Sequence, residues 1–166
     1  MLDLTPDLCD LYADKLQLLP LPFNSYGGKR VFYGEVVTVQ CFHDNSMVRQ
    51  VLAQDGTGKV LFIDGHGLCD KALLGDQLAI LAMQNNWQGI IVHGAIRDAG
   101  AISNMDIGVQ ALGTCPFKTE KKGLGQINAT VNIGQNQIKP GQSIYADVNA
   151  VLTSETPLDV DKLTAN

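Results

Sequence analysis

The stretch VLFIDGHGLCDKALLGDQLAILAMQNNWQGIIVHGAIRD, residues 60–98, decides the fold of this chain. Residues 60–64 form a short apolar run bounded by glycine, which predicts a strand buried on both faces. Apolar residues then recur at helical spacing over 76–86 and end at an Asn-Asn pair, which predicts a helix. Residues 89–93 predict a second buried strand, so the stretch forms a βαβ unit with parallel strands.

The lengths of these elements predict that two polar segments lie side by side. A helix of about ten residues at 1.5 Å rise covers about 16 Å, and a strand of about five residues at 3.3 Å covers the same length in return. We therefore expect Arg97 and Asp98 beside Gly75 and Asp76, with the loop 65–67 at the same edge. In open α/β sheets, ligands bind at this edge.

The sequence on both sides of this unit predicts a larger α/β domain. Thr5 is expected to cap a helix that runs to about Lys15, and Asp44 or Asn45 to cap a short helix. The other expected elements are strands at 31–42, 108–112, 131–133, 137–138 and 143–153, a short helix at 101–105 and a loop at 19–28. We predict one domain over residues 1–166, with a central parallel layer and antiparallel strands from the ends.

Composition excludes several classes of protein. Of the 166 residues, 45% are hydrophobic and 17% are charged, which excludes a disordered chain. The net charge is −5 and the sequence contains no basic stripe that could neutralise several phosphates, so we do not expect direct binding of nucleic acid. No apolar stretch approaches the roughly 18 residues of a membrane span, and the acidic start does not resemble a signal peptide. We therefore expect a cytoplasmic protein whose four cysteines are reduced and mostly buried.

The predicted start of the central helix suits a small anion. Its unpaired backbone amides and its dipole favour a carboxylate. These amides belong to Gly75, Asp76, Gln77 and Leu78. Arg97 offers a planar guanidinium for the same anion or for a developing enolate. Asp98 and Asp76 add oxygen ligands of the kind that Mg²⁺ and Mn²⁺ take in proteins.

Plainer interpretations of the same residues stay open on spacing alone. Asp76 can be a first-turn acid that stabilises its helix by about 1 kcal/mol. The adjacent pair at 97–98 can be an exposed ion pair of little energetic worth. The basic loop with Lys118, Lys121 and Lys122 is either a solvated loop or the source of a lysine that reaches the anion-binding edge.

The run ALLGDQLAILAMQNNWQGIIVHGAIRDAGAISNMDIGVQALGTCPFKTEKKGLGQ, residues 72–126, resembles the RraA-like family. This family contains class II 4-hydroxy-4-methyl-2-oxoglutarate aldolases and the regulator of ribonuclease activity A. Its aldolase signature is Gly-Asp, twenty residues and Arg-Asp, and residues 77–96 supply that spacing here. The resemblance extends to TPDLCDLY (5–12), YGG (26–28), TVQCFHDNSMV (38–48), VLFIDGHG (60–67) and PGQSIYADVNAV (140–151).

The resemblance implies a fold, an assembly and an activity. The fold is a swivelling β/β/α domain, the assembly is a homotrimer, and the cofactor is a divalent metal, Mg²⁺ or Mn²⁺. The activity is metal-dependent retro-aldol cleavage of a small 2-oxo acid, 4-hydroxy-4-methyl-2-oxoglutarate, to two pyruvates. Oxaloacetate decarboxylation is the implied side activity, because it passes through the same pyruvate enolate, stabilised by the metal and Arg97.

The resemblance also implies roles for individual residues. Residues 75–78 bind the pyruvyl carboxylate, and Arg97 binds substrate and stabilises the enolate oxygen. Asp98 is the direct metal ligand. Asp76 holds metal-bound water, which is one candidate for the proton carrier. The family's aldolases carry a lysine before a Gly-x-Gly run, and Lys121 matches it best.

Lys118 is the second match to the family lysine. The Arg-Asp pair separates the branches of the family. Members of the regulator branch can lack the Arg-Asp pair, which this chain keeps at 97–98. The pair therefore favours the catalytic branch. The alternative function is a protein that inhibits ribonuclease E by binding the enzyme rather than RNA, and an acidic chain can cover a basic surface.

Overall fold

A ten-stranded mixed sheet organises this computed structural model, which describes residues 3–165. Eight strands follow the order β1-β12-β11-β3-β4-β6-β7-β2, while β5 pairs with β6 and β8 with β3. The sheet strands are β1 (Gln17–Leu18), β2 (Asn24–Ser25), β3 (Phe32–Gln40), β4 (Lys59–Asp64), β5 (Ala72–Leu74), β6 (Gly89–Ile96), β7 (Gly108–Thr114), β8 (Gln126–Ile127), β11 (Ser143–Ala146) and β12 (Val151–Ser154). A separate hairpin pairs β9 (Val131–Ile133) with β10 (Asn136–Ile138).

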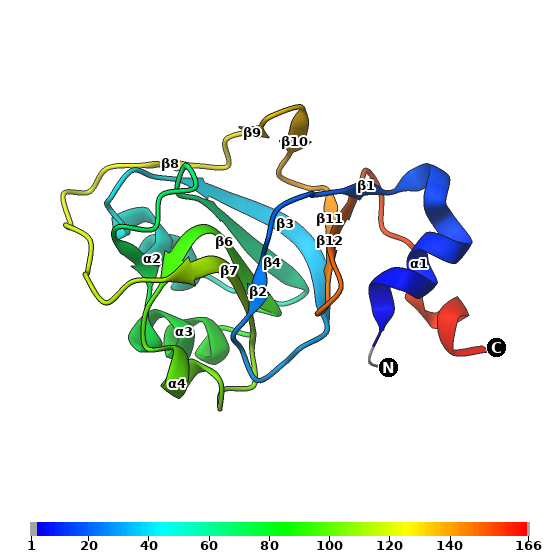
Figure 1. Ribbon diagram of the computed structural model, residues 1–166, viewed down its shortest axis with the longest axis horizontal. Coiled ribbons are helices and arrows are strands. Elements are labelled where there is room, and N and C mark those ends of the chain that lie inside the picture. The colour runs from blue at the N-terminus through cyan, green and yellow to red at the C-terminus, as the bar shows by residue number, and fades with distance from the viewer. Residues whose placement is uncertain (1–2, 166) are drawn as a thin grey trace.

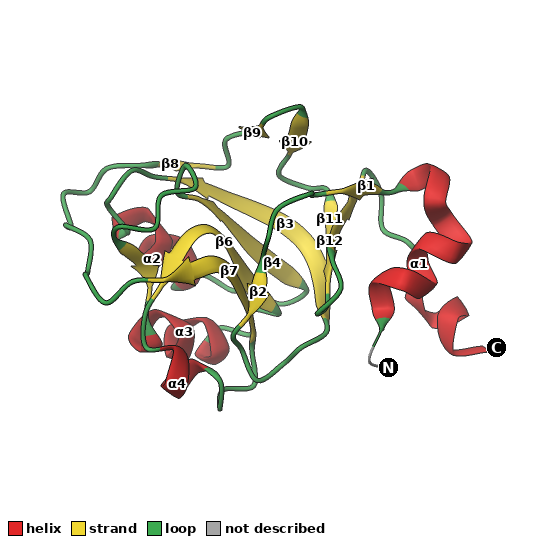
Figure 2. Cartoon of the chain, in the orientation of Figure 1, coloured by secondary structure: helices red, strands yellow, loops and turns green. Residues whose placement is uncertain are grey.

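Helices lie on one side of the sheet and at one end of the molecule (Figure 1). The helical elements are α1 (Leu4–Tyr12), η1 (Ala13–Lys15), α2 (Ser46–Leu52), α3 (Asp76–Gln84), α4 (Ala99–Ile102) and η2 (Val160–Ala165). Figure 2 shows α2, α3 and α4 gathered beside the central strands, whereas α1 lies at the opposite end near both ends of the chain. No helix within residues 3–165 is both long and apolar enough to cross a membrane.

The predicted parallel centre is confirmed. Strands β3, β4, β6 and β7 are parallel neighbours, and β11, β12, β1 and β2 add antiparallel pairs at the flanks. All side chains of residues 60–64 are buried, because β4 lies between β3 and β6 and has packing on both faces. Leu61 and Ile63 pack with the α2 and α3 side, whereas Val60 and Phe62 pack with strands on the other face.

Several predicted boundaries differ from the structure, among them those of β6, the β11–β12 hairpin and α4. The strand expected at 89–93 continues to Ile96, because the unpredicted strand β5 gives its last residues a partner. The expected strand 143–153 is a hairpin of β11 and β12, with a turn at Asp147. The short helix expected at 101–105 is α4, two residues earlier at its start.

The predicted cap at Thr5 is also wrong, and Asp147 explains why. Thr5 lies inside α1, and its amide and hydroxyl donate to the two carboxylate oxygens of Asp147 at 2.8 and 2.7 Å. The same carboxylate accepts the amides of Asn149 and Ala150, so it closes the β11–β12 turn as well. A distant side chain therefore satisfies a first-turn amide of α1.

The cysteines are free, as predicted, but only two of them are buried. Cys41 and Cys115 are buried, whereas Cys9 and Cys69 are exposed. Burial, with smaller contributions from the nearby Asp64 and Asp44 charges, raises the pKa of Cys41 to about 12. This thiol therefore stays protonated and behaves as a small apolar group.

Candidate functional site

The start of α3 and the end of β6 meet, as the lengths of the elements predict. The Arg97 amide donates to the Leu74 carbonyl at 2.9 Å, which pairs the ends of β5 and β6. The Asp76 amide donates to Asp98 Oδ2 at 3.0 Å. A β-carbon at Gly75 would lie 2.7 Å from that same oxygen, so the close approach requires glycine. Asp98 has a positive φ of 57°, which turns the chain sharply after β6.

These segments enclose a small cavity of about 120 Å³. All the predicted site residues line it. They are Gly75, Asp76, Gln77, Leu78, Arg97, Asp98 and Lys121, together with Lys118, the second match to the family lysine. The cavity is also lined by Asn45, Arg49, Ala72 and Thr119. The loop 65–67 does not line this cavity, although it follows a neighbouring parallel strand.

A buried carboxylate holds the lysine loop against the cavity. Asp44 is 2% exposed, and its Oδ2 accepts the amides of Lys122 and Leu124 at 2.7 and 3.2 Å. Its Oδ1 accepts the Ser46 amide and hydroxyl. Burial alone would raise the pKa of Asp44, but the hydrogen bonds from Ser46, Lys122 and Leu124 outweigh it and lower the pKa to about 2. Asp44 therefore stays ionised, and its hydrogen bonds join the start of α2 to the lysine loop.

The contacts of the loop show which of its lysines are free to face the cavity. Lys122 Nζ contacts Glu120 Oε2 at 2.6 Å, so this lysine is occupied by an exposed neighbour. The Glu120 amide donates to the His43 carbonyl, and the Ala72 amide donates to the Phe117 carbonyl. Lys118 and Lys121 are the loop lysines that line the cavity. Of the two interpretations of this loop, the structure therefore supports the one in which lysines reach the anion-binding edge.

The charges around the cavity favour an anionic ligand. Arg49, Arg97, Lys118 and Lys121 line it, against the two acids Asp76 and Asp98. Arg97 Nε lies 3.8 Å from Asp98 Oδ2, and both side chains are more than a third exposed, so this pair is weakly held. The surplus of positive charge suits a ligand with more than one negative charge.

Sequence reasoning missed Asn45 and Arg49, although a signal for them exists. Asn45 immediately precedes α2 and Arg49 lies within it, four residues later, and the Arg49 amide donates to the Asn45 carbonyl at 3.2 Å. Because α2 follows a parallel strand, its start must lie at the carboxyl edge of the sheet. The four-residue spacing then places Asn45 and Arg49 on one face of the helix.

The oxygen ligands fit a hydrated hard cation. Within residues 3–165, no three Asp, Glu, His or Cys side chains are placed to hold a metal by themselves. One oxygen of Asp98 accepts the Asp76 amide, and no described residue donates to the other oxygen. Mg²⁺ takes one or two carboxylates and keeps several waters, so Asp98 and Asp76 fit Mg²⁺ or Mn²⁺. They do not form a zinc site, which takes three or four protein ligands.

Arg97 and Asp98 also border a second, wider cavity. It has a volume of about 340 Å³, and its remaining lining is Ala99, Thr114, Cys115 and Pro116. The two cavities lie against the same arginine and carboxylate. A ligand held at Arg97 therefore has room beside it for a further fragment.

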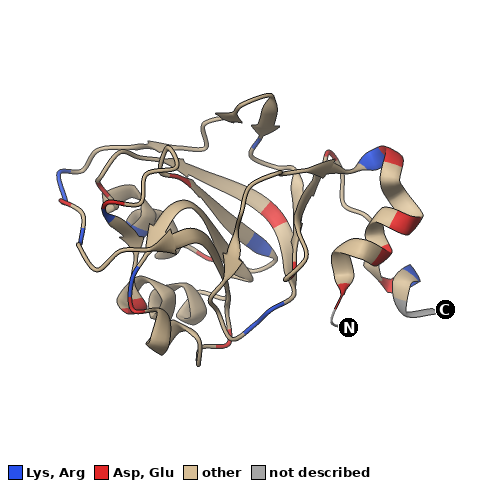
Figure 3. Cartoon of the chain, in the orientation of Figure 1, with Lys and Arg blue, Asp and Glu red and all other residues tan. Residues whose placement is uncertain are grey.

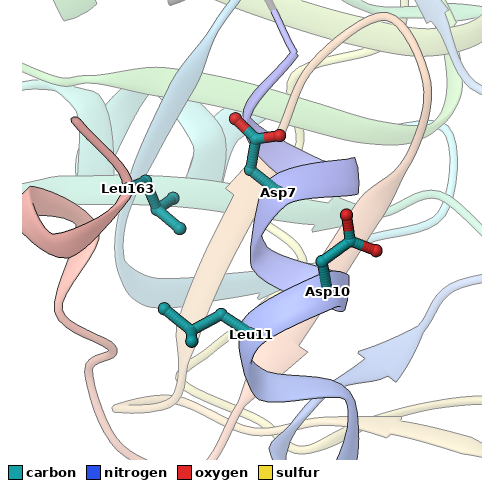
Figure 4. A pocket seen from close by; sticks show the side chains of 4 residues that line it. All are labelled: Asp7, Asp10, Leu11 and Leu163. Atoms are coloured by element: carbon teal, nitrogen blue, oxygen red, sulfur yellow. The ribbon is translucent and has the colours of Figure 1, made fainter. Parts of the chain in front are cut away.

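A wider cavity at the other end of the molecule has no cationic side chain among its described lining residues. Figure 4 shows Asp7, Asp10 and Leu11 on α1 facing Leu163 near the end of the chain, around a cavity of about 420 Å³. Acids and leucines line it. Figure 3 shows acidic residues along α1, whereas basic residues mark the loop after β7 at the opposite end of the molecule. The anion-binding groups thus gather at the carboxyl edge of the parallel strands.

The fold and the cavity define a mixed α/β domain with a cationic site for a small anion at the carboxyl edge of its parallel strands. Residues 5–153 match the RraA-like family, described as Aldolase/RraA, and the chain belongs to this family.

Relatives in sequence carry a common name. The chain is 59% identical over 159 residues to a protein of Vibrio parahaemolyticus, covering 96% of this chain and 99% of that protein. It is 58% identical over 160 residues to a protein of Vibrio cholerae, covering 96% and 99%. Both carry the provisional name 4-hydroxy-4-methyl-2-oxoglutarate aldolase.

Solved structures confirm the fold under two different names. A Geobacillus kaustophilus protein, named S-adenosylmethionine:2-dimethylmenaquinone methyltransferase, superposes with a TM-score of 0.90 at 45% identity. The alignment covers 93% of this chain and 96% of that protein. The RNA-processing inhibitor RraA from Thermus thermophilus gives a TM-score of 0.89 at 39% identity, covering 93% and 94%.

Proposed function

We propose that this protein is a metal-dependent lyase that cleaves 4-hydroxy-4-methyl-2-oxoglutarate to two pyruvates. The observation that carries the proposal is the meeting of the α3 amides, Arg97, Asp98 and Lys121 around one cavity. The names of the Vibrio relatives support the same reaction. Oxaloacetate decarboxylation is the expected side activity, because loss of CO₂ from oxaloacetate leaves the same pyruvate enolate.

The start of α3 binds the carboxylate next to the 2-oxo group. The first amide bonded within the helix is that of Ala79, which donates to the Gly75 carbonyl. The Asp76 amide is taken by Asp98, which leaves the amides of Gln77 and Leu78 for a carboxylate. The adjacent Arg97 guanidinium stabilises the oxygen on which negative charge develops.

Asp98 is the residue that would hold Mg²⁺ or Mn²⁺, and Asp76 would hold one of its waters. The bound ion supplies Lewis-acid polarisation of the 2-oxo group. In the cleavage, a base accepts the proton of the C4 hydroxyl and the C3–C4 bond breaks. The electron pair passes toward the C2 carbonyl as an enolate, and C4 becomes the keto carbon of the second pyruvate. Protonation at C3 completes the reaction. The water held by Asp76 is one candidate for the proton carrier, and Lys121, which also lines the cavity, is another.

Oxaloacetate turnover with and without a chelator tests this proposal. We expect turnover in Mg²⁺ or Mn²⁺, loss of turnover in EDTA and recovery on return of the metal. Asp98→Ala should lower turnover by about a hundredfold or more. Asp106→Ala, which removes an exposed acid outside the cavity, is the matched control. Activity that survives EDTA, or a D98A enzyme as fast as wild type, would contradict the proposal.

The second candidate function is inhibition of an RNA-processing enzyme by protein binding. The name of the Thermus relative and the net charge of −5 favour it. A pull-down with ribonuclease E separates the two functions, because the interaction should persist in D98A if it does not use the cavity. No retention of ribonuclease E by the wild-type chain would dismiss this candidate.

We also propose that the chain forms a homotrimer, which the resemblance to the family implies, and that it resides in the cytoplasm. Light scattering on the purified chain should give a mass of about three times 17.9 kDa. A monomeric mass would contradict this assembly.

A further inference from the structure

Two of the cavity's cations are not used by the proposed chemistry. Arg97 is proposed to stabilise the enolate and Lys121 is a candidate for the proton carrier, whereas Arg49 has no assigned role and Lys118 is only the second match to the family lysine. Neither of these two forms an ion pair with a residue in the described part of the chain. Like charges gathered around a small cavity repel each other unless an anion lies between them. Their placement therefore indicates a second negative group on the ligand.

The N-terminal end of α2 is fixed beside the segment that leads into α3, where the proposed function places the first carboxylate. Asn45 Nδ2 donates to the Leu73 carbonyl at 3.2 Å, two residues before Gly75. Arg49 lies one helical turn after Asn45, and α2 and α3 share one hydrophobic core. Arg49 is thus carried by a helix that is anchored to the segment leading into the site.

Two polar atoms of the cavity residues lack partners. Asn45 Oδ1 and Thr119 Oγ1 are buried and have no hydrogen bond within the described residues. Thr119 is 5% exposed and lies between Lys118 and Lys121 in the chain. A buried polar group without a partner is destabilising, so such groups in native proteins are normally satisfied by a ligand or an ordered water. This part of the cavity is therefore polar and cationic, and two of its buried oxygen atoms lack a hydrogen-bond partner among residues 3–165.

We propose that Arg49, supported by Lys118, binds the second carboxylate of a dicarboxylic 2-oxo acid and makes the site selective for dicarboxylates. The inference rests on the proposed function for the position of the first carboxylate. A planar guanidinium matches a carboxylate in a two-bond arrangement, which a lysine cannot reproduce. Asn45 and Thr119 provide polar surroundings for that end of the ligand.

A matched pair of unreactive ligands tests the proposal by calorimetry. Both 2-oxoglutarate and 2-oxopentanoate have five carbons, and they differ in whether the far end is a carboxylate or a methyl group. In Mg²⁺, the wild-type chain should bind 2-oxoglutarate about tenfold or more tightly than 2-oxopentanoate. Arg49→Gln should abolish this preference and leave the Kd of 2-oxopentanoate within about twofold of wild type.

Two variants make the test specific. Arg49→Lys keeps the charge but loses the planar group, so it should restore only part of the preference. Arg30→Gln removes an exposed arginine outside the cavity and should leave both affinities unchanged. Circular-dichroism melting of each variant checks that it is folded.

The outcomes separate this inference from the proposed function. A folded R49Q that keeps the preference, or a wild-type chain without any preference, overturns the inference even if oxaloacetate is turned over. An Arg49-dependent preference without oxaloacetate turnover supports the second-carboxylate site and contradicts the lyase.

Discussion

Two aspartates of this chain make the same local turn and have different consequences. Asp44 accepts the amide and hydroxyl of Ser46, and Asp55 accepts the amide and hydroxyl of Thr57. The distances are similar, with hydroxyl contacts of 2.6 and 2.7 Å. Asp44 is buried under the lysine loop, whereas Asp55 lies on the exposed turn before β4.

The difference lies in the second carboxylate oxygen. In Asp44 this oxygen accepts the amides of Lys122 and Leu124, residues 78 and 80 positions away. The hydrogen bonds that Asp55 accepts from the described residues stay within its own turn. A local Asp-x-Ser or Asp-x-Thr motif thus becomes part of a functional site only when a distant segment uses its free oxygen. Asp44 is then a positioning residue for the loop that carries Lys118 and Lys121.

Among the substitutions that test the difference between the two turns, Asp44→Asn should have the largest effect. The amide oxygen can still accept the Ser46 donors, but the new NH₂ group would face the amides of Lys122 and Leu124. We expect a loss of about 3 kcal/mol in the free energy of unfolding, because buried donors lose their acceptor. Urea unfolding measures this loss.

The same variant tests the positioning role. Oxaloacetate turnover should fall in D44N, and the fall should be much smaller when Lys121 is already replaced by Ala, since the two residues then act as one unit. Equal, additive effects of the two substitutions would show that Asp44 stabilises the fold without acting through Lys121.

The pH dependence of unfolding tests the same difference through a smaller effect. The pKa of Asp44 is lowered from 3.8 to about 2, so the folded state favours its charged form. The stability that Asp44 contributes is fully present above pH about 4 and is lost as the pH falls toward 2. The wild-type free energy of unfolding should therefore fall more steeply than that of D44N over this window. Parallel curves for the two proteins would show that folding does not lower the pKa of Asp44.

Asp55→Asn should have the smallest effect. Hydrogen bonds from Thr57 lower the pKa of Asp55, but its carboxylate is exposed and the contacts stay within one turn. We expect unfolding and oxaloacetate turnover within experimental error of wild type. A loss comparable to that of D44N would remove the distinction between the two turns.

The sequence predicts features that depend on contiguous residues better than those that depend on remote pairing. The meeting of Asp76 with Asp98 could be predicted, because one βαβ unit of known rise contains both. Strand β5 is three residues long and is stabilised by its pairing with the end of β6, so its own sequence gives little signal. The contact of Asp44 with Lys122 joins two loops, and no local periodicity encodes it.

The contribution of α2 lies between these cases. The sequence predicts Asn45 as a possible helix cap but does not predict its place in the cavity. The parallel order of β3 and β4 would have located the start of α2 at the correct edge. The sequence does not indicate that α2 begins beside Leu73, because that position depends on packing between α2 and α3.

The bond network at Asp147 bears on the order in which the chain can fold during its synthesis. Thr5 and Asp147 are 142 positions apart, and Leu4 and Leu8 pack with Tyr145 and Leu152. When α1 leaves the ribosome, its apolar side has no surface to cover it until nearly the whole chain has been translated. Loop closure over so many residues is slow, so the first helix to be made is among the last to dock.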